Sequence, residues 1–340
     1  MLASVLDSPV ALITLSALLI AAIVLAVHSA EVVAHRVGEP FGTLILAVCV
    51  TVIEVALISA IMLSRSPGSE LIARDAVFAA IMIVTNGVIG LAILIGGIRH
   101  HELTFRIEGS NSALTVLAAL STLTLVLPSF TQSSQGPTYT ETQLIFAGLS
   151  SLALYGTFVF VQTVRHRDYF LPVTPAALQN KNSHAPKPTR RKTLRSGVLL
   201  VLALILVVGL AKALSPAIER GVAALGAPRA LVGIIIAGLV LAPESVAAIR
   251  AAIANRLQTS FNLALGSALA SIGLTIPTVA ILSILFELPL NLGLSPVEIT
   301  LLALTLISGI ITLATGKTAV LQGVVHLVIF VAYLFLTIVP

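Results

Sequence analysis

Long apolar stretches without charged side chains are the feature that most constrains the fold of this chain. A helix needs about 20 mostly apolar residues to cross the hydrocarbon core of a bilayer. Stretches of this kind without Asp, Glu, Lys or Arg lie at 8–30, 76–98, 109–140, 142–164, 257–286, 299–316 and 318–340. Stretches with a single charge lie at 40–64 with Glu54, 196–218 with Lys212 and 230–249 with Glu244. The sequence therefore predicts an all-α polytopic membrane protein with ten transmembrane helices.

The composition indicates that most of the surface faces lipid. Charged residues make up 10% of the chain, hydrophobic residues make up 57%, and the mean hydropathy is +1.08. Soluble domains carry about 25% charged residues, so a soluble protein is excluded. The single cysteine, Cys49, excludes an intramolecular disulfide and a metal cluster built on cysteine. The sequence has no Gly-rich phosphate-binding loop, which argues against ATP as an energy source.

The distribution of basic residues predicts the orientation. Eight of the 19 Lys and Arg residues lie between residues 165 and 195, where they are typical of a cytoplasmic loop and not of a nucleic-acid-binding surface. With the N-terminus outside, the inner side holds 14 basic residues and the outer side holds 5. We therefore expect both termini outside the membrane and the central loop in the cytoplasm.

Five helices on each side of the central loop place the two halves in opposite directions. The predicted organisation is a first half at 1–165, a basic linker at 166–194 and a second half at 195–340. Weak internal similarity supports an inverted repeat, because a short motif ending in proline precedes each lone glutamate. The matching pairs are Gly38-Glu39-Pro40 with Gly226-Ala227-Pro228, Glu54 with Glu244, and VIGLAILIGG at 88–97 with SIGLTIPTVA at 271–280. Inverted repeats are typical of secondary transporters.

Glu54 and Glu244 are the principal candidate functional residues. A charged side chain at the bilayer centre costs about 2.5–3.5 kcal/mol on insertion scales, so such residues are usually functional. The structural alternative is a glutamate that is permanently protonated and hydrogen-bonded within the bundle. The matching positions in the two halves, with no basic residue at the same depth, favour the functional interpretation.

Oxygen ligands surround these two positions in the sequence. Thr51 precedes Glu54 by one helical turn, and Pro243 leaves the carbonyl of Leu239 without its donor. Further candidates on the partner helices are Thr85, Asn86, Asn262, Ser267 and Ser271. An oxygen-only set suits Ca²⁺, Na⁺ or K⁺ and does not suit zinc or copper. For each hydroxyl taken singly, a helix–helix hydrogen bond is the more common role.

Three other titratable residues lie within or near the spans. For His28 and His326, a hydrogen-bonded packing role is favoured over a proton relay. Glu31 lies near the inner end of the first helix, where it either guards an entrance or is simply solvated.

Two segments carry a resemblance to a known family. These are GEPFGTLILAVCVTVIEVALISAIM at 38–62 and LAPESVAAIRAAIANRLQTSFNLALGSALASIGLTIP at 241–277. They resemble the two α-repeats of the Ca²⁺:cation antiporter superfamily, most closely the bacterial ChaA-type Ca²⁺/H⁺ (also Na⁺/H⁺ and K⁺/H⁺) antiporters. The resemblance implies ten helices in two inverted halves in a bacterial inner membrane, with the first and sixth helices as a mobile gate. It also implies that Glu54 and Glu244 bind a cation or protons in turn. The chain departs from the family in its basic central loop and in Ser245, which stands where a glycine is expected and adds a candidate hydroxyl ligand.

The predicted function is proton-coupled antiport that exports Ca²⁺ in exchange for H⁺, because two carboxylates neutralise one Ca²⁺ or two protons equally well. A Na⁺-coupled Ca²⁺ exchanger needs more acidic or polar ligands than these spans offer. The alternatives left open are a Na⁺(K⁺)/H⁺ antiporter with little Ca²⁺ activity and, from a different class, a cation channel. The expected partners are inorganic cations, protons and the lipid bilayer, with no enzymatic activity, no cofactor and no nucleic acid.

Overall fold

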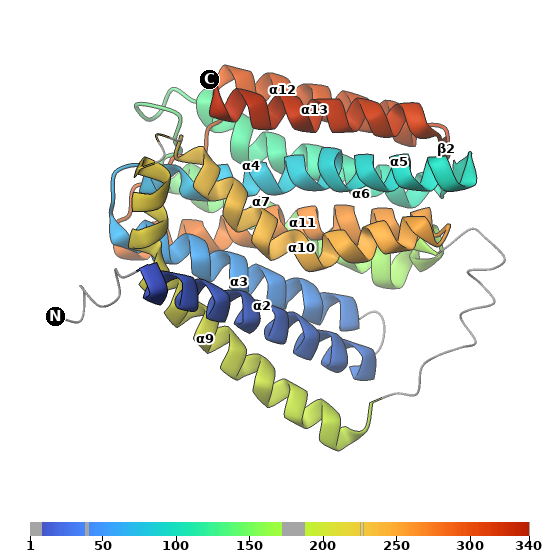
Figure 1. The fold of residues 1–340 in the computed structure, drawn as a ribbon. Coiled ribbons are helices and arrows are strands. Elements are labelled where there is room, and N and C mark those ends of the chain that lie inside the picture. Colours follow the sequence, from blue (N-terminus) through green and yellow to red (C-terminus); the bar gives the residue numbers. More distant parts are fainter. Residues whose placement is uncertain (1–8, 38–40, 172–187, 225, 227, 340) are drawn as a thin grey trace.

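The structure is a computed structural model that describes residues 9–37, 41–171, 188–224, 226 and 228–339. Most of this chain is helical, and Figure 1 shows long helices lying side by side in a bundle. Backbone groups in lipid must be hydrogen-bonded within the protein, which long helices achieve by themselves. The predicted all-α fold is confirmed.

The helices of the first half form five rods. They are α2 (Pro9–Val37); α3 (Phe41–Ser64); η1 (Ser69–Leu71) with α4 (Ile72–Met82), the π-helix η2 (Ile83–Val88) and α5 (Ile89–His100); α6 (Ile107–Ser121) with η3 (Thr122–Val126) and η4 (Leu127–Ser129); and α7 (Glu141–Phe160) with η5 (Val161–Arg165) and η6 (Arg167–Phe170).

The second half repeats this number of rods. They are α9 (Arg190–Ala224), α10 (Ala230–Ile253), α11 (Leu257–Phe286), α12 (Pro296–Leu313) and α13 (Val320–Ile338). Among the described residues, nine helical stretches are long and apolar enough to cross a membrane, and Val48–Ser64 of α3 forms a shorter tenth. The ten predicted spans therefore correspond to the ten rods.

Short polar motifs and prolines mark several helix ends. Thr140 caps α7 and Ser295 caps α12, each through a reciprocal capping box with the residue three positions later. Strands β1 (Leu103–Thr104) and β2 (Lys317–Thr318) pair antiparallel and tie the α5–α6 loop to the α12–α13 loop. The basic residues from Arg190 onward belong to the first turns of α9, so the predicted linker ends earlier than residue 194. Its central part, 172–187, lies outside the described residues, as do Gly38, Glu39 and Pro40.

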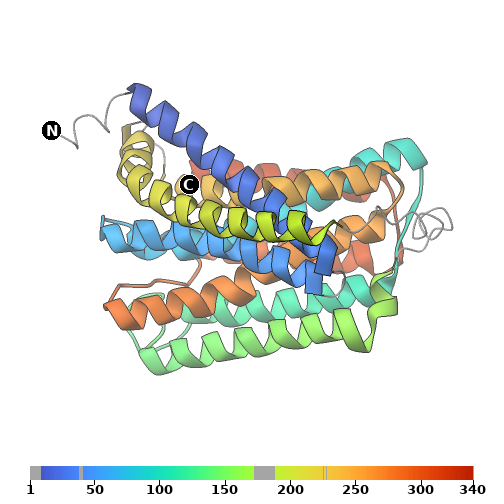
Figure 2. The ribbon, with the colours of Figure 1, turned by 90° about the horizontal axis from the view of Figure 1, so that it is seen from below.

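The two halves run in opposite directions. Figure 1 shows that α2 begins and α13 ends at one end of the bundle, which we call the terminal end. At the opposite end, which we call the linker end, α2 ends and α9 begins. Helix contacts repeat between the halves: α3 packs against α11 as α10 packs against α4, and α7 packs against α11 as α13 packs against α5. Helix α2 packs against both α9 and α3, and Figure 2 shows α2 and α9 on one side of the bundle.

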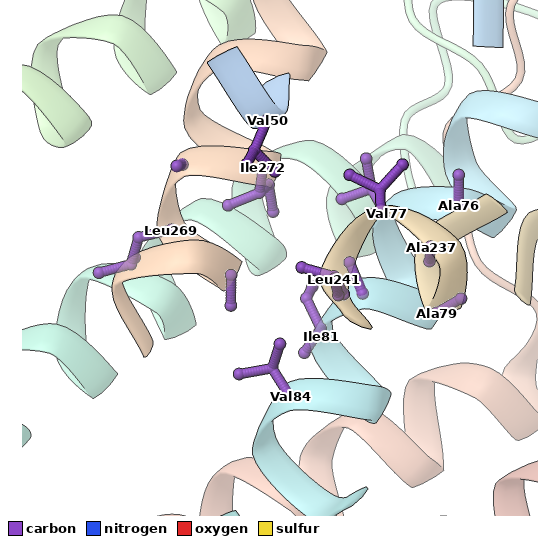
Figure 3. Close-up of a cluster of buried hydrophobic side chains, with 14 of the residues drawn as sticks. Val50, Ala76, Val77, Ala79, Ile81, Val84, Ala237, Leu241, Leu269 and Ile272 are labelled. Atoms are coloured by element: carbon purple, nitrogen blue, oxygen red, sulfur yellow. The ribbon is translucent and has the colours of Figure 1, made fainter. Parts of the chain in front are cut away.

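The core lies where α3, α4, α10 and α11 meet. Figure 3 shows its side chains converging there from all four helices: Val50 from α3, Val77 and Ile81 from α4, Leu241 from α10 and Ile272 from α11. Each of these side chains is buried. The same four helices carry most of the candidate residues, so any site between them is enclosed by an apolar wall.

Candidate functional site

Glu54 and Ser271 are brought into contact by the packing of α3 on α11. The Ser271 hydroxyl donates a hydrogen bond of 2.6 Å to Oε1 of Glu54. Glu54 is only 2% exposed, and Ser271 is 3% exposed. A carboxylate and a hydroxyl predicted from separate halves of the sequence therefore meet in the interior, 217 residues apart in the chain.

Glu244 lies at a different depth from Glu54. A short turn at the linker end joins α10 to α11, so depth along both helices can be counted from that turn. At roughly 1.5 Å per residue, Ser271 lies about 21 Å from the turn and Glu244 lies about 14 Å from it. By this count the backbone of Glu244 lies about 7 Å nearer the linker end than the backbone of Ser271, whose hydroxyl contacts Glu54.

Two oxygen atoms near these carboxylates, Oε2 of Glu244 and Oγ1 of Thr51, are buried without a hydrogen-bond partner among the described residues. The hydroxyl of Thr275 lies within hydrogen-bonding reach of the Glu54 carboxylate. A buried polar group left unpaired costs about 1–3 kcal/mol. Carboxylate and hydroxyl oxygens of this kind are the ligand atoms that hard cations prefer.

Thr275 was not predicted from the sequence. It lies one helical turn beyond Ser271 on α11 and is fully buried. The signal was present, because Ser267, Ser271 and Thr275 recur every four residues and therefore share one face of the helix.

The electrostatic surroundings leave both carboxylates without a basic partner. In the described part of the chain, neither Glu54 nor Glu244 forms an ion pair with Lys or Arg. The apolar wall of Figure 3 keeps the local dielectric low, which strengthens attraction for any cation that enters. No three His, Cys, Asp or Glu side chains gather within the described ranges, so hydroxyl and carbonyl oxygens would have to complete a cation shell.

Three other predicted hydroxyls differ in their contacts. Ser267 is half-buried, one turn from Ser271 toward the linker end, at the depth of Glu244. The Ser245 hydroxyl donates to the carbonyl of Leu241 at 2.7 Å, and the Thr85 hydroxyl donates to the carbonyl of Ile81 at 2.5 Å. Both of these donors bond within their own helices, and the Thr85 hydroxyl also accepts from the amide nitrogen of Asn86 at 3.4 Å.

The structure does not bring Asn86 or Asn262 to Glu54. The Asn262 amide donates to the carbonyl of Phe170 at 2.6 Å and accepts from Gln258 at 2.9 Å, near the start of α11. Nine residues separate Asn262 from Ser271, or about 14 Å along the helix, which is too far for a shared ion. Asn262 is therefore not placed beside Glu54; its amide ties α11 to the segment after α7.

Asn86 belongs to a separate polar network. Its amide nitrogen donates to Thr305 at 2.8 Å, and its amide oxygen lies 2.9 Å from Nδ1 of His326. The other ring nitrogen of His326 lies 3.1 Å from the hydroxyl of Thr312. Because both polar atoms of Asn86 are engaged with α12 and α13, they are not directed to Glu54.

The two histidines have different environments. His326 is 2% exposed and hydrogen-bonded on both ring nitrogens, as expected of a packing histidine. His28 is exposed, and its Nδ1 lies 3.8 Å from Oε2 of Glu31 one turn away. The packing role predicted for His28 is therefore wrong, because its side chain is 70% exposed.

Asp75 is a buried charge that the sequence analysis did not single out. It is 5% exposed, and its Oδ1 lies 2.7 Å from Nη2 of Arg74 and 2.8 Å from Nε of the same guanidinium. This pair lies near the terminal end of α4 beside a cavity of about 70 Å³ that Arg229 also lines. Charge compensation by Arg74 accounts for its burial.

The fold and the buried oxygens together define a class of protein. Oppositely directed halves with uncompensated carboxylates in the interior are features of an α-helical membrane transporter. The chain belongs to the sodium/calcium exchanger protein family, whose sequence pattern matches residues 8–164 and 195–339. This confirms the resemblance to the Ca²⁺:cation antiporter superfamily.

Individual relatives agree with the family. The chain is 52% identical to the y4hA protein of Sinorhizobium fredii, covering 98% of this chain and 90% of that protein. It is 33% identical to the sodium-potassium/proton antiporter ChaA of Escherichia coli, covering 91% and 83%. It is 23% identical to a Ca²⁺/H⁺ antiporter of Aphanothece halophytica, covering 74% and 71%.

Solved structures show the same fold. YfkE superposes with a TM-score of 0.74 at 17% identity, covering 100% of this chain and 96% of that one. The H⁺/Ca²⁺ exchanger CAX superposes with a TM-score of 0.68 at 18% identity, covering 94% and 79%. The inverted-repeat helical fold is therefore confirmed.

Proposed function

We propose that this protein is a proton-coupled cation antiporter that exports Ca²⁺ in exchange for H⁺ by alternating access. The observation that carries the proposal is a pair of carboxylates without basic partners: Glu54 is buried, and Glu244 is half-buried with its Oε2 atom enclosed and unpaired. A buried carboxylate without a counter-charge is stable only when it binds a proton or a cation. A carboxylate of this kind releases its cation only when a proton replaces it, and the reverse, which couples the two movements.

Charge balance supports coupling to protons. Two carboxylates are neutralised by one Ca²⁺ or by two protons, so replacing one with the other leaves the buried charge unchanged. An empty, doubly ionised site would carry the full desolvation penalty of two charges, which opposes leakage without exchange. Each carboxylate therefore alternates between a cation-bound and a protonated state.

The ligand chemistry supports a hard cation. Ca²⁺ takes six to eight oxygen ligands at about 2.3–2.6 Å, from carboxylates, hydroxyls, carbonyls or water. Thr51, Ser267, Ser271 and Thr275 offer hydroxyl oxygens at depths near those of the two carboxylates. Water would supply the rest of the shell.

A Na⁺(K⁺)/H⁺ antiporter with little Ca²⁺ activity is the second candidate. The observation in its favour is the 33% identity to the sodium-potassium/proton antiporter of E. coli, higher than the 23% identity to the Ca²⁺/H⁺ antiporter. A monovalent cation needs only one carboxylate, and the offset between Glu54 and Glu244 would allow each to act alone. Membership of an exchanger family favours both carriers over the cation channel.

Transport in vesicles separates these possibilities. Purified protein is reconstituted with a pH-sensitive dye inside the vesicles, and Ca²⁺, Na⁺ or K⁺ is then added outside. We expect Ca²⁺ to drive proton movement at micromolar to millimolar concentrations, with vesicles lacking protein as the control. Proton movement with Na⁺ or K⁺ alone would establish the second candidate. Cation flux without proton counterflow would refute proton-coupled antiport.

A further inference from the structure

We propose that Glu31 of α2 is a third functional carboxylate, which collects the cation at the linker end and delivers it to Glu244. The inference rests on the proposed function and adds a specific step to it. It assigns a role to an exposed residue outside the interior site.

The depth of Glu31 places it next in line after Glu244. The Cys49 thiol of α3 lies 3.9 Å from the carbonyl of Ala26, which fixes the level of α2 against α3. Glu31 lies five residues beyond Ala26 toward the linker end, and Cys49 lies five residues from Glu54 in the same direction. By this count the backbone of Glu31 lies about 15 Å from that of Glu54 along the bundle, and the backbone of Glu244 lies at about half that depth. The three residues therefore follow one another from the linker end inward.

The lateral arrangement agrees with this order. Helix α2 contacts both α3 and α10. The Glu244 carboxylate lies within electrostatic range of Cys49 and of Glu31. A cation held by Glu31 is therefore attracted by the next carboxylate before it leaves the first.

Glu31 is accessible and is only weakly compensated. Its side chain is 58% exposed, in contrast to the 2% of Glu54. His28 lies 3.8 Å away, which is longer than a hydrogen bond. Arg36 in the following turn donates to the carbonyl of Pro188. The carboxylate is thus open to ions arriving from the linker end.

An independent observation points to a ligand further along this path. Oε2 of Glu244 is buried and unpaired, and so is the hydroxyl of Thr51, whose residue is 6% exposed. Thr51 lies between the depths of Glu54 and Glu244. The path inward from Glu31 therefore leads to buried oxygens of the type that ligate hard cations.

The test asks whether a single substitution changes the apparent KM for Ca²⁺ from only one side of the membrane. Glu31→Gln is made in the full chain, and the apparent KM for Ca²⁺ is measured in right-side-out and everted membrane vesicles. A surface carboxylate raises the local cation concentration, so we expect its loss to raise KM about threefold to tenfold for Ca²⁺ supplied from the linker side. The maximal rate and the KM from the terminal side should not change. The difference should shrink at high salt, because exposed charges are screened.

Glu102→Gln is the matched control. Glu102 has an equally exposed carboxylate at the linker end, but it is 2.8 Å from Lys317 and lies by the β1–β2 pair. This variant should behave as wild type, and Glu31→Asp should restore most of the affinity lost in Glu31→Gln. An unchanged KM from the linker side, or an equal rise from both sides, would overturn the role of Glu31. If the wild-type protein itself shows no proton-coupled exchange, the proposed function fails and this inference fails with it.

Discussion

At the scale of single residues, the contact between Ser271 and Glu54 is the most informative. The hydroxyl donates to the carboxylate at 2.6 Å and keeps two lone pairs that can face an ion. Thr51 and Thr275 lie on either side of this contact; the Thr51 hydroxyl has no partner within the described chain, and the Thr275 hydroxyl lies within reach of the same carboxylate. We therefore propose that the hydroxyl group of Ser271 orients Glu54 and also contributes an oxygen ligand to the same site.

Substitution of Ser271 by alanine tests this double role. Ser271→Ala removes one oxygen ligand and leaves Glu54 less well oriented, so the apparent KM for the transported cation should rise about tenfold, equivalent to about 1.4 kcal/mol. Thr278→Ala is the control, because the Thr278 hydroxyl bonds only to the carbonyl of Leu274 in its own helix. Equal KM values for the Ser271 variant and the wild-type protein would show that the serine is not a ligand.

At the scale of helices, glycines permit the close approach of α13 to α5. A Cβ on Gly323 would lie 2.6 Å from the backbone nitrogen of Leu94 and 2.8 Å from the carbonyl oxygen of Gly90. Both obstacles are backbone atoms, so the two helices would have to separate. This crossing also carries His326, which holds Asn86 in the π-helix η2. The packing of α13 therefore holds in place the rod formed by α4, η2 and α5.

Gly323→Ala should lower the free energy of unfolding by about 1–3 kcal/mol, because the added methyl group overpacks this crossing. The purified protein is heated in detergent, and the folded fraction that remains at each temperature is measured by fluorescence-detected size-exclusion chromatography. Gly238→Ala on α10 is the matched control, because its Cβ would meet nothing within 4 Å, and it should match or exceed wild type. A Gly323 variant as stable as wild type would contradict the close approach.

Helix bounds were predictable where charged residues flank an apolar run. The predicted span 257–286 coincides with α11, because Arg256 precedes it and Glu287 adopts the left-handed conformation that ends it. Helical spacing also predicted that Thr51 shares a face with Glu54. Contacts between helices were not predictable, because spacing gives the face of a residue and not its neighbour. Asn262 was for this reason assigned to a site that it does not reach.

At the scale of the whole molecule, two oppositely directed halves bring one glutamate each to the interior. The halves enter the membrane in opposite senses because each contains five rods. The basic residues then determine which end faces the cytoplasm, and their 14-to-5 distribution favours the linker end. This orientation is a prediction that labelling can test.

Introduced cysteines report the orientation directly. In a Cys49→Ala background, Gln135→Cys at the terminal end should react with a membrane-impermeant thiol reagent added to intact cells. Arg190→Cys at the linker end should react only after the cells are opened. The reverse pattern would mean that the linker end faces outward.

The central claim is that Glu54 and Glu244 bind a cation and protons in turn. Its most direct test is cation-driven proton movement by Glu54→Gln and Glu244→Gln in reconstituted vesicles. Glutamine keeps the shape and hydrogen bonding of the protonated acid but supplies no charge and releases no proton. Both variants should therefore insert and fold normally, and proton movement should fall to the level of vesicles without protein. Exchange by Glu244→Gln at a rate near that of wild type would contradict the account.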